Sequence, residues 1–376
     1  MCDLPSLPFH FQSFEEVPLL TKEEVQQNPN AYQRRGLLPV SQKKTSGTTG
    51  LSLNLRRSLP ALIFEQAMID WVVNQAGHDL RSERVAVLRG DDIKALDDIS
   101  PPFWRVANGH TMTFSSNHLS SQTLPHFLTA LREFRPDILY AYPSGADQLA
   151  RLTMAAGERL HFPLVLTSSE SFPDFVRKRI SDAFSTHVVD YYGQGERVAF
   201  AYSLESNRYR FHPAYGLIEL IPLSDQGGAP LAKEIVGTSF HNSAQVLARY
   251  RTGDFVEIGD ESEAYLSDIA NGRKTFSGIS GRTSEILYGP GGEVLTGLNQ
   301  IPRGLEQYGR MQLIQDAPDH VEILMQSRQS NSRAATAHVL ARSRSKIPSS
   351  MAIDVKFVDE LVRTSAGKVP FVLHRT

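Results

Sequence analysis

The segment "DILYAYPSGADQLARLTMAAG" (137–157) joins a short apolar run to a helical pattern. Residues 137–142 have the length and apolar character of a buried strand. Pro143 suits the first turn of a helix, where a missing N–H costs nothing, and Gly157 is a typical helix end. The segment therefore predicts a β-strand followed directly by an α-helix.

The same alternation continues on both sides of this segment. Short apolar runs predict further strands, and amphipathic patterns between them predict helices. The strands are expected at 84–90, 163–170 and 186–193, and the helices from Ser58 to about Gly77, at 121–134 and at 173–184. Strands that alternate with helices predict a parallel sheet with helices on its faces.

The pattern changes twice further along the chain. After Glu196, strand-like stretches with turn residues between them predict an antiparallel or mixed sheet that completes a large domain. From about Thr283, a hairpin around Gly289–Gly292, a strand pair at 311–326, a helix at 331–344 and a strand at 352–358 predict a smaller unit. The expected fold class is α/β: a large N-terminal domain (1–282) of parallel and mixed sheets flanked by helices, and a small mobile α+β C-terminal domain (283–376).

Composition narrows the class of protein. The chain has 376 residues, a net charge of −2 and one cysteine, Cys2. The balanced charge favours neither a nucleic-acid partner nor a polybasic membrane surface, and a single cysteine excludes a disulfide framework or a cysteine-based zinc site. There is no run of about 18 apolar residues and no basic, apolar leader pattern at the start. We therefore expect a cytoplasmic protein.

The stretch "TSGTTG" (45–50) combines glycines with hydroxyl side chains. Glycine lets the backbone come close to a ligand, and exposed N–H groups with hydroxyls can cradle phosphate oxygens. Such a stretch alone is more often a plain polar loop. It is not the Walker phosphate loop, because no Gly-Lys-Ser/Thr follows at the required spacing.

Four further motifs follow in order: "YYGQGE" (191–196), "YRTGD" (250–254), "SGRTSE" (280–285) and "RTSAGK" (363–368). Each is a small turn with a charged residue and is weak evidence alone. In this order and spacing, with "TSGTTG" before them, they resemble the adenylate-forming superfamily of acyl-CoA synthetases and nonribosomal adenylation domains. The resemblance covers nearly the whole chain and is strongest to the phenylacetate-CoA ligase and capsule-biosynthesis-type branch.

The resemblance implies a site for ATP and Mg2+. "TSGTTG" would hold the β- and γ-phosphates, Tyr192 would stack on the adenine, and Asp254 would accept hydrogen bonds from the ribose hydroxyls. Glu196 would hold Mg2+, which prefers oxygen ligands, and is also assigned a catalytic role. The residues implied to bind ATP are Thr45, Ser46, Gly47, Thr48, Thr49, Gly50, Tyr191, Tyr192, Gly193, Asp254 and Arg282.

The resemblance also assigns the catalytic lysine and the hinge. Lys368 would bridge the substrate carboxylate and the α-phosphate while charge moves onto pyrophosphate. Arg282 lies beside the expected hinge between the domains. The chain departs from the family pattern at three positions, Leu51, Gly195 and Ser284, and its segment before the phosphate loop is short.

The implied reaction has two halves. A carboxylate attacks the α-phosphorus of ATP to give acyl-AMP and pyrophosphate, and a thiol such as CoA then takes the acyl group. A carrier protein, an amine or a hydroxyl as acceptor stays open, as does a homodimer. A degenerate homologue that binds nucleotide without turnover is a further alternative, which the departures favour and which Glu196, Asp254 and Lys368 oppose.

The acyl pocket is the least specific part of the sequence. The resemblance places it at the ends of the predicted parallel strands, and an aromatic set with scattered hydroxyls suits a planar aryl acid. The alternative is that these aromatic residues only fill the core. The candidates are Tyr140, Tyr142, Ser144, Gly145, Ser168 and Ser169, with Phe103, Trp104 and His110 as further contributors from a preceding loop.

Overall fold

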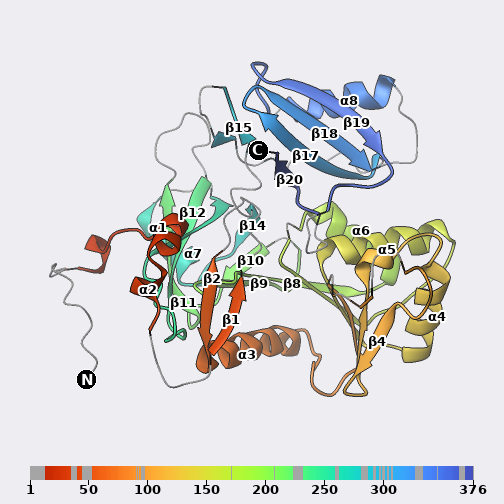
Figure 1. Cartoon of the computed structure of the whole chain (residues 1–376), viewed down its shortest axis with the longest axis horizontal. Coiled ribbons are helices and arrows are strands. Elements are labelled where there is room, and N and C mark those ends of the chain that lie inside the picture. The colour runs from red at the N-terminus through yellow and green to blue at the C-terminus, as the bar shows by residue number, and fades with distance from the viewer. Residues whose placement is uncertain are drawn as a thin grey trace.

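The structure is a computed structural model. It describes residues 13–34, 40–44, 53–89, 91, 93–94, 98–170, 172–206, 208–222, 232–258, 262–280, 287–290, 294–295, 298, 301–302, 305, 308–326, 333–344, 346–363 and 369–375. Figure 1 shows a large sheet flanked by helices and, apart from it, a smaller C-terminal sheet drawn in blue. The predicted α/β fold class is confirmed.

Half of the large sheet is parallel. Its strands run in the order β8-β7-β6-β3-β5, and each neighbouring pair is parallel. The strands are β3 (Val85–Leu88), β5 (Thr111–Phe114), β6 (Ile138–Ala141), β7 (Leu164–Ser168) and β8 (His187–Gly193). The predicted alternation of strands and helices is therefore confirmed, including the strand and helix at 137–157.

Helices cover both faces of these parallel strands. On one face, α3 (Leu59–Gln75) packs on a set that includes Val85, Ile138 and Leu164. On the other, α4 (Leu124–Phe134), α5 (Pro143–Ala155) and α6 (Asp174–Phe184) pack on the alternate residues of the same strands. Burial on both faces explains why the strands are continuous apolar runs.

The other half of the sheet is antiparallel, as predicted for the chain after Glu196. It continues from β8 in the order β9-β10-β14-β13-β12-β11. Its strands are β9 (Phe200–Ser203), β10 (Arg208–Phe211), β11 (Gly216–Pro222), β12 (Ala232–Ser239), β13 (Tyr250–Glu257) and β14 (Phe276–Ser280), and α7 (Glu263–Ala270) precedes β14. Both halves thus form one continuous sheet.

Several short elements were not predicted. Strand β4 (Trp104–Ala107) pairs antiparallel with β5 at the outer edge of the sheet, and β1 (Val40–Lys44) pairs antiparallel with β2 (Asn54–Ser58). Near the start of the described chain lie η1 (Phe14–Glu16), α1 (Lys22–Gln27) and α2 (Pro29–Tyr32), and η2 (Ser116–His118) follows β5. These elements are too short to show a clear hydrophobic period.

The C-terminal sheet has the order β19-β18-β17-β20. It contains β17 (Arg310–Ala317), β18 (His320–Gln326), β19 (Ala352–Val358) and β20 (Val372–His374), with α8 (Arg333–Ser343) and the small hairpin β15 (Leu287–Tyr288) and β16 (Val294–Leu295). The predicted hairpin, strand pair, helix and strand at 352–358 are confirmed. The predicted boundary between 282 and 283 lies outside the described residues and stays a prediction.

A close backbone approach anchors the segment that follows β8. Val198 lies against two glycines, Gly216 in β11 and Gly237 in β12. A Cβ on Gly216 would lie 2.4 Å from the carbonyl oxygen of Val198, and one on Gly237 would lie 2.7 Å from the same oxygen. Because Val198 lies two positions after Glu196, these glycines also fix where the glutamate sits.

We expect Gly216→Ala to lower the free energy of unfolding by about 1–3 kcal/mol, because the added methyl group meets backbone that cannot yield cheaply. Denaturant unfolding measures the change. The neighbouring Leu217, whose side chain is exposed, provides the control: Leu217→Ala should change stability by no more than about 0.5 kcal/mol. Equal stability of Gly216→Ala and the wild type would contradict the close approach.

Candidate functional site

The carboxyl ends of the parallel strands bring polar side chains to one edge of the sheet. Arg89 follows β3, Tyr142 follows β6, Ser169 follows β7 and Gln194 follows β8. Open α/β sheets bind their ligands outside this edge, because the loops there converge while helices cover the faces. The predicted site residues that the structure describes lie at this edge or next to it.

Two predicted motifs are joined by a reciprocal pair of hydrogen bonds, which we call the reciprocal exchange. The Tyr192 hydroxyl donates a hydrogen bond of 2.6 Å to Asp254 Oδ2, and the Tyr250 hydroxyl donates one of 3.1 Å to Glu196 Oε1. The tyrosine of each motif thus holds the carboxylate of the other. Asp254 is 2% exposed and Glu196 8% exposed, so both carboxylates are shielded from water.

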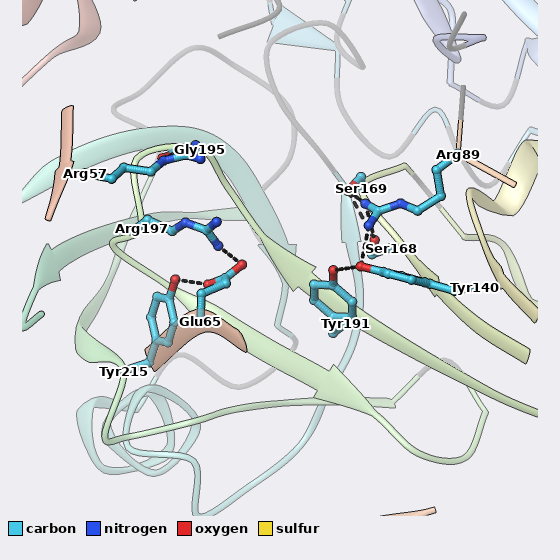
Figure 2. Close-up of polar contacts among 10 residues, drawn as sticks. All are labelled: Arg57, Glu65, Arg89, Tyr140, Ser168, Ser169, Tyr191, Gly195, Arg197 and Tyr215. Carbon is cyan, nitrogen blue, oxygen red and sulfur yellow. Dashed lines mark hydrogen bonds and ion pairs between the residues drawn. The ribbon is translucent and has the colours of Figure 1, made fainter. Parts of the chain in front are cut away.

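The turn after β8 is held by a buried arginine that the sequence analysis missed. Arg57, in β2, donates from Nε and Nη2 to the carbonyl oxygen of Gly195 at 3.0 and 2.8 Å (Figure 2). Burial lowers the pKa of Arg57 below its usual value, and the nearby charge of Glu196 partly opposes that shift. The turn that carries Glu196 therefore has a positive charge beside it.

A second buried group supports the same turn from α3. Arg197 forms an ion pair with Glu65, and the Tyr215 hydroxyl donates to the same carboxylate (Figure 2). Burial raises the pKa of Tyr215 above its usual range, so the phenol stays protonated and keeps donating. Gly193 lies against this group, since a Cβ there would be 3.6 Å from Glu65 Oε1. The group ties α3 to the end of β8.

A different cluster, which we call the Arg89 cluster, joins several candidate pocket residues. Arg89 Nη2 donates to the hydroxyls of Ser168 and Ser169 at 3.1 and 3.2 Å, and Nη1 donates to the hydroxyl of Tyr140. The hydroxyls of Tyr140 and Tyr191 are hydrogen-bonded to each other (Figure 2). Tyr191 therefore points to the Arg89 cluster, whereas its neighbour Tyr192 points to Asp254.

The remaining pocket candidates divide into polar and packing roles. Ser144 donates from its backbone N and from Oγ to the carboxylate of Glu170 at 2.8 and 2.9 Å, and so places that charge at the start of α5. The ring of Tyr142 lies 5.0 Å from the Arg89 guanidinium. Gly145 lets α5 approach β3 closely, because a Cβ would lie 3.1 Å from the Leu88 carbonyl oxygen.

The expected contribution of Phe103 to the pocket is not what the structure shows. Phe103 is fully buried and stacks on Phe127 in the core between the sheet and α4–α6. Trp104 packs at the margin of the same core, and His110 lies in the turn between β4 and β5. The sequence left open whether Phe103 lines the pocket or fills the core, and its complete burial assigns it to the core.

Several predicted residues lie outside the described part of the chain. They are Thr45, Ser46, Gly47, Thr48, Thr49 and Gly50, together with Leu51, Arg282, Ser284 and Lys368. Their roles stay predictions. In the described ranges, no three His, Cys, Asp or Glu side chains group as metal ligands, so the part of Glu196 in holding Mg2+ also stays a prediction.

Loss of one hydrogen bond of the exchange should weaken the fold measurably. Tyr250→Phe leaves the buried Glu196 carboxylate without its donor, and we expect a loss of about 1.5–3 kcal/mol in the free energy of unfolding. Tyr288→Phe is the control, because this tyrosine is exposed and its hydroxyl has no hydrogen-bond partner among the residues that the structure describes. Urea unfolding of both variants is the measurement, and two identical transitions would rule out the exchange as a stabilising contact.

Comparisons with known proteins agree with this architecture. Residues 288–375 match the CapK C-terminal domain family. Protein CapK of Staphylococcus aureus is 23% identical over 252 residues, which cover 66% of this chain and 55% of CapK. The match thus spans about half the length of that relative.

Solved structures show the same fold over most of the chain. A 2-hydroxyisobutyryl-CoA ligase in complex with an acyl-AMP has a TM-score of 0.60 at 14% identity, covering 96% of this chain and 80% of that one. An anthranilate CoA ligase with anthranoyl-AMP has a TM-score of 0.55 at 15% identity, covering 88% and 66%. The resemblance to adenylate-forming ligases, and to their capsule-biosynthesis-type branch, is therefore confirmed. No helix in the described ranges is long and apolar enough to cross a membrane.

Proposed function

We propose that this protein uses ATP to activate a carboxylic acid as acyl-AMP, releases pyrophosphate, and transfers the acyl group to a thiol such as that of CoA. The observation that carries the proposal is the reciprocal exchange, Tyr192 with Asp254 and Tyr250 with Glu196. It brings together the two motifs whose resemblance implies binding of adenosine and of Mg2+. The fold shared with two ligases that hold acyl-AMP supports the same reaction.

The described residues suit the nucleotide. A carboxylate accepts several hydrogen bonds at once, so Asp254 can hold the ribose hydroxyls while Tyr192 remains bound to Oδ2. That bond also fixes the ring of Tyr192 beside the ribose site, where it would lie against the adenine. The adenosine would thus sit between the end of β8 and the start of β13.

The phosphates would lie beside the turn that follows β8. Tyr250 binds Glu196 Oε1, and no other described residue donates a hydrogen bond to that carboxylate. Its oxygens fit Mg2+, which would neutralise phosphate charge when bound. Arg57 adds a fixed positive charge at the same turn, and residues 45–50 would cradle the β- and γ-phosphates from the loop that precedes β2.

The chain's contribution to the chemistry would be positioning and charge neutralisation, because no protein nucleophile is needed for attack on the α-phosphorus. Lys368 would stabilise the charge that develops in the first half-reaction, and the small domain would then rotate to admit the thiol. We further propose an aryl acid as substrate, since the rings of Tyr140 and Tyr142 lie at the edge where the acid must bind.

Acid-dependent release of pyrophosphate tests the function. The protein is incubated with ATP, Mg2+ and one acid at a time from an aryl and an aliphatic series, and the products are separated for acyl-AMP. We expect release with a subset of the acids, enhanced when CoA is added. Nucleotide binding without release for any acid would favour a degenerate homologue. Release that CoA does not enhance would favour a carrier protein, an amine or a hydroxyl as acceptor.

Asp254→Ala should weaken ATP binding by about 1.5–3 kcal/mol, because it removes the acceptor for the ribose hydroxyls. Calorimetric titration with ATP gives the affinity. Asp182→Ala, on the exposed surface of α6, is the matched control and should bind ATP as the wild type does. Unchanged ATP affinity of Asp254→Ala would remove this residue from the nucleotide site.

Lys368→Ala should slow acyl-AMP formation by roughly 10²–10³-fold, the effect of removing one preorganised charge-stabilising group. Transfer from synthetic acyl-AMP to the acceptor should keep its native rate. Rapid quench times each half-reaction separately. The control is Lys356→Ala. Lys356 lies in β19, and its side chain forms an ion pair with Glu322. An equal loss in both half-reactions would contradict the role of Lys368.

A further inference from the structure

Arg89 is a shielded cation without an acidic partner among the described residues. Its Nη groups donate to three hydroxyls, those of Tyr140, Ser168 and Ser169. Its Nε is buried and has no hydrogen-bond partner in the described part of the chain. The Nε atoms of Arg151 and Arg197 are in the same state, but Arg89 as a whole is partly exposed and lies at the edge of the sheet where a ligand would bind.

Three other shielded arginines of the described chain are paired with carboxylates, whereas the buried Arg57 and Arg177 donate to backbone carbonyls. Arg179 lies 2.6 Å from Asp147, and Arg249 lies 2.7 Å from Glu219. Arg197 is paired with Glu65. Removing a charge from water is costly unless an opposite charge or full hydrogen bonding replaces the water. Arg89 is compensated differently, because its hydrogen bonds go to side-chain hydroxyls alone.

The neighbouring tyrosines do not supply the missing negative charge. Burial raises the pKa of Tyr140 well above its usual value of 10, so its phenol is neutral at physiological pH. Burial would lower the pKa of Arg89, but the neighbouring tyrosines outweigh it and the net shift is upward, so the guanidinium keeps its charge. The Arg89 cluster is thus positively charged.

We propose that Arg89 binds a second acidic group of the acyl substrate, so that the acids activated by this protein carry an additional carboxylate, sulfonate or phosphate. The inference rests on the proposed function. The ligand group would meet the partly exposed Arg89 guanidinium and the exposed hydroxyl of Ser169, which accepts from Nη2 and can donate its own proton to an anion. The carboxyl to be activated would lie nearer to Glu196 and Asp254.

Aromatic contacts favour this use of the arginine. The Arg89 guanidinium carbon lies 4.3 Å from the ring centroid of Tyr140 and 5.0 Å from that of Tyr142. Cation–π contact and the hydrogen bonds of the planar guanidinium hold it in one orientation before a ligand arrives. A preorganised cation beside two aromatic rings suits an aromatic acid with a second acidic substituent better than an aromatic acid with a single carboxyl group.

Matched pairs of acids test the proposal. Benzoate is compared with isophthalate and terephthalate, and phenylacetate with phenylenediacetates, by acid-dependent pyrophosphate release. The wild type should prefer the diacid of each pair. Arg89→Met should lower kcat/KM for the diacids by roughly 100-fold more than for the monoacids, the cost of truncating one partner of a buried charge pair. Arg89→Lys, which keeps the charge, should retain part of the preference.

The control is Arg84→Met. Arg84 precedes the same strand at its opposite end, is largely exposed and lies 3.9 Å from Asp137. This variant should keep the wild-type preference. If Arg89→Met lowers the rates for monoacids and diacids by the same factor, or changes neither, Arg89 has only a structural role and the proposal is overturned, while the proposed function stands.

A binding measurement separates the two proposals. Thermal unfolding is followed without ATP as isophthalate or terephthalate is added. Benzoate, which lacks the second carboxylate, is the comparison. The diacids should raise the Tm of the wild type and of Arg84→Met but not that of Arg89→Met. If no acid releases pyrophosphate but the Arg89-dependent shift is present, the acidic subsite stands and the ligase activity falls. No shift in the wild type together with no preference in turnover overturns the subsite.

Discussion

The candidate site depends on the reciprocal exchange, two hydrogen bonds that link β13 to the end of β8 and to the turn after it. Tyr192 binds Asp254, and Tyr250 binds Glu196. Glu196 lies in the turn after β8 and Asp254 lies within β13, so these two hydrogen bonds link segments that are far apart in the sequence. The backbone approach of Val198 to Gly216 and Gly237 fixes the same segment from the far side. The antiparallel half of the sheet therefore helps to position Glu196, which follows the last parallel strand.

The two groups of residues drawn in Figure 2 differ in the partners that surround their arginines. Around the turn after β8, arginines meet carboxylates or a backbone carbonyl: Arg197 meets Glu65, and Arg57 holds Gly195 beside Glu196. In the Arg89 cluster, the guanidinium meets only hydroxyls among the described residues. Shielded charges without an opposite charge are costly in a stable fold, so this contrast supports the proposed acidic subsite at Arg89.

The small domain meets the large one through polar contacts on α5. Arg151 Nη2 donates to Gln326 Oε1 at 3.3 Å, and Arg363 Nη2 donates to Gln148 Oε1 at 3.1 Å. On the large domain, Asp147 is fully buried between Arg151 and Arg179, so the helix that faces the small domain is itself held rigid. Polar interfaces of this kind between domains commonly permit relative motion, which agrees with the proposed rotation between half-reactions.

The sequence by itself determined the parallel half of the sheet, since strands such as 137–142 and helices such as 143–157 carry their own hydrophobic period and end residues. The order of the motifs along the chain also predicted that Tyr192, Glu196 and Asp254 lie close together, and the structure joins these motifs by hydrogen bonds. Only the tertiary structure showed that Phe103 belongs to the core, that Arg57 holds the turn before Glu196 and that Arg89 bonds the candidate pocket residues. An isolated arginine after an apolar strand looks like any surface cation in a sequence, because its role depends on which residues the fold brings around its guanidinium and on how much water they exclude.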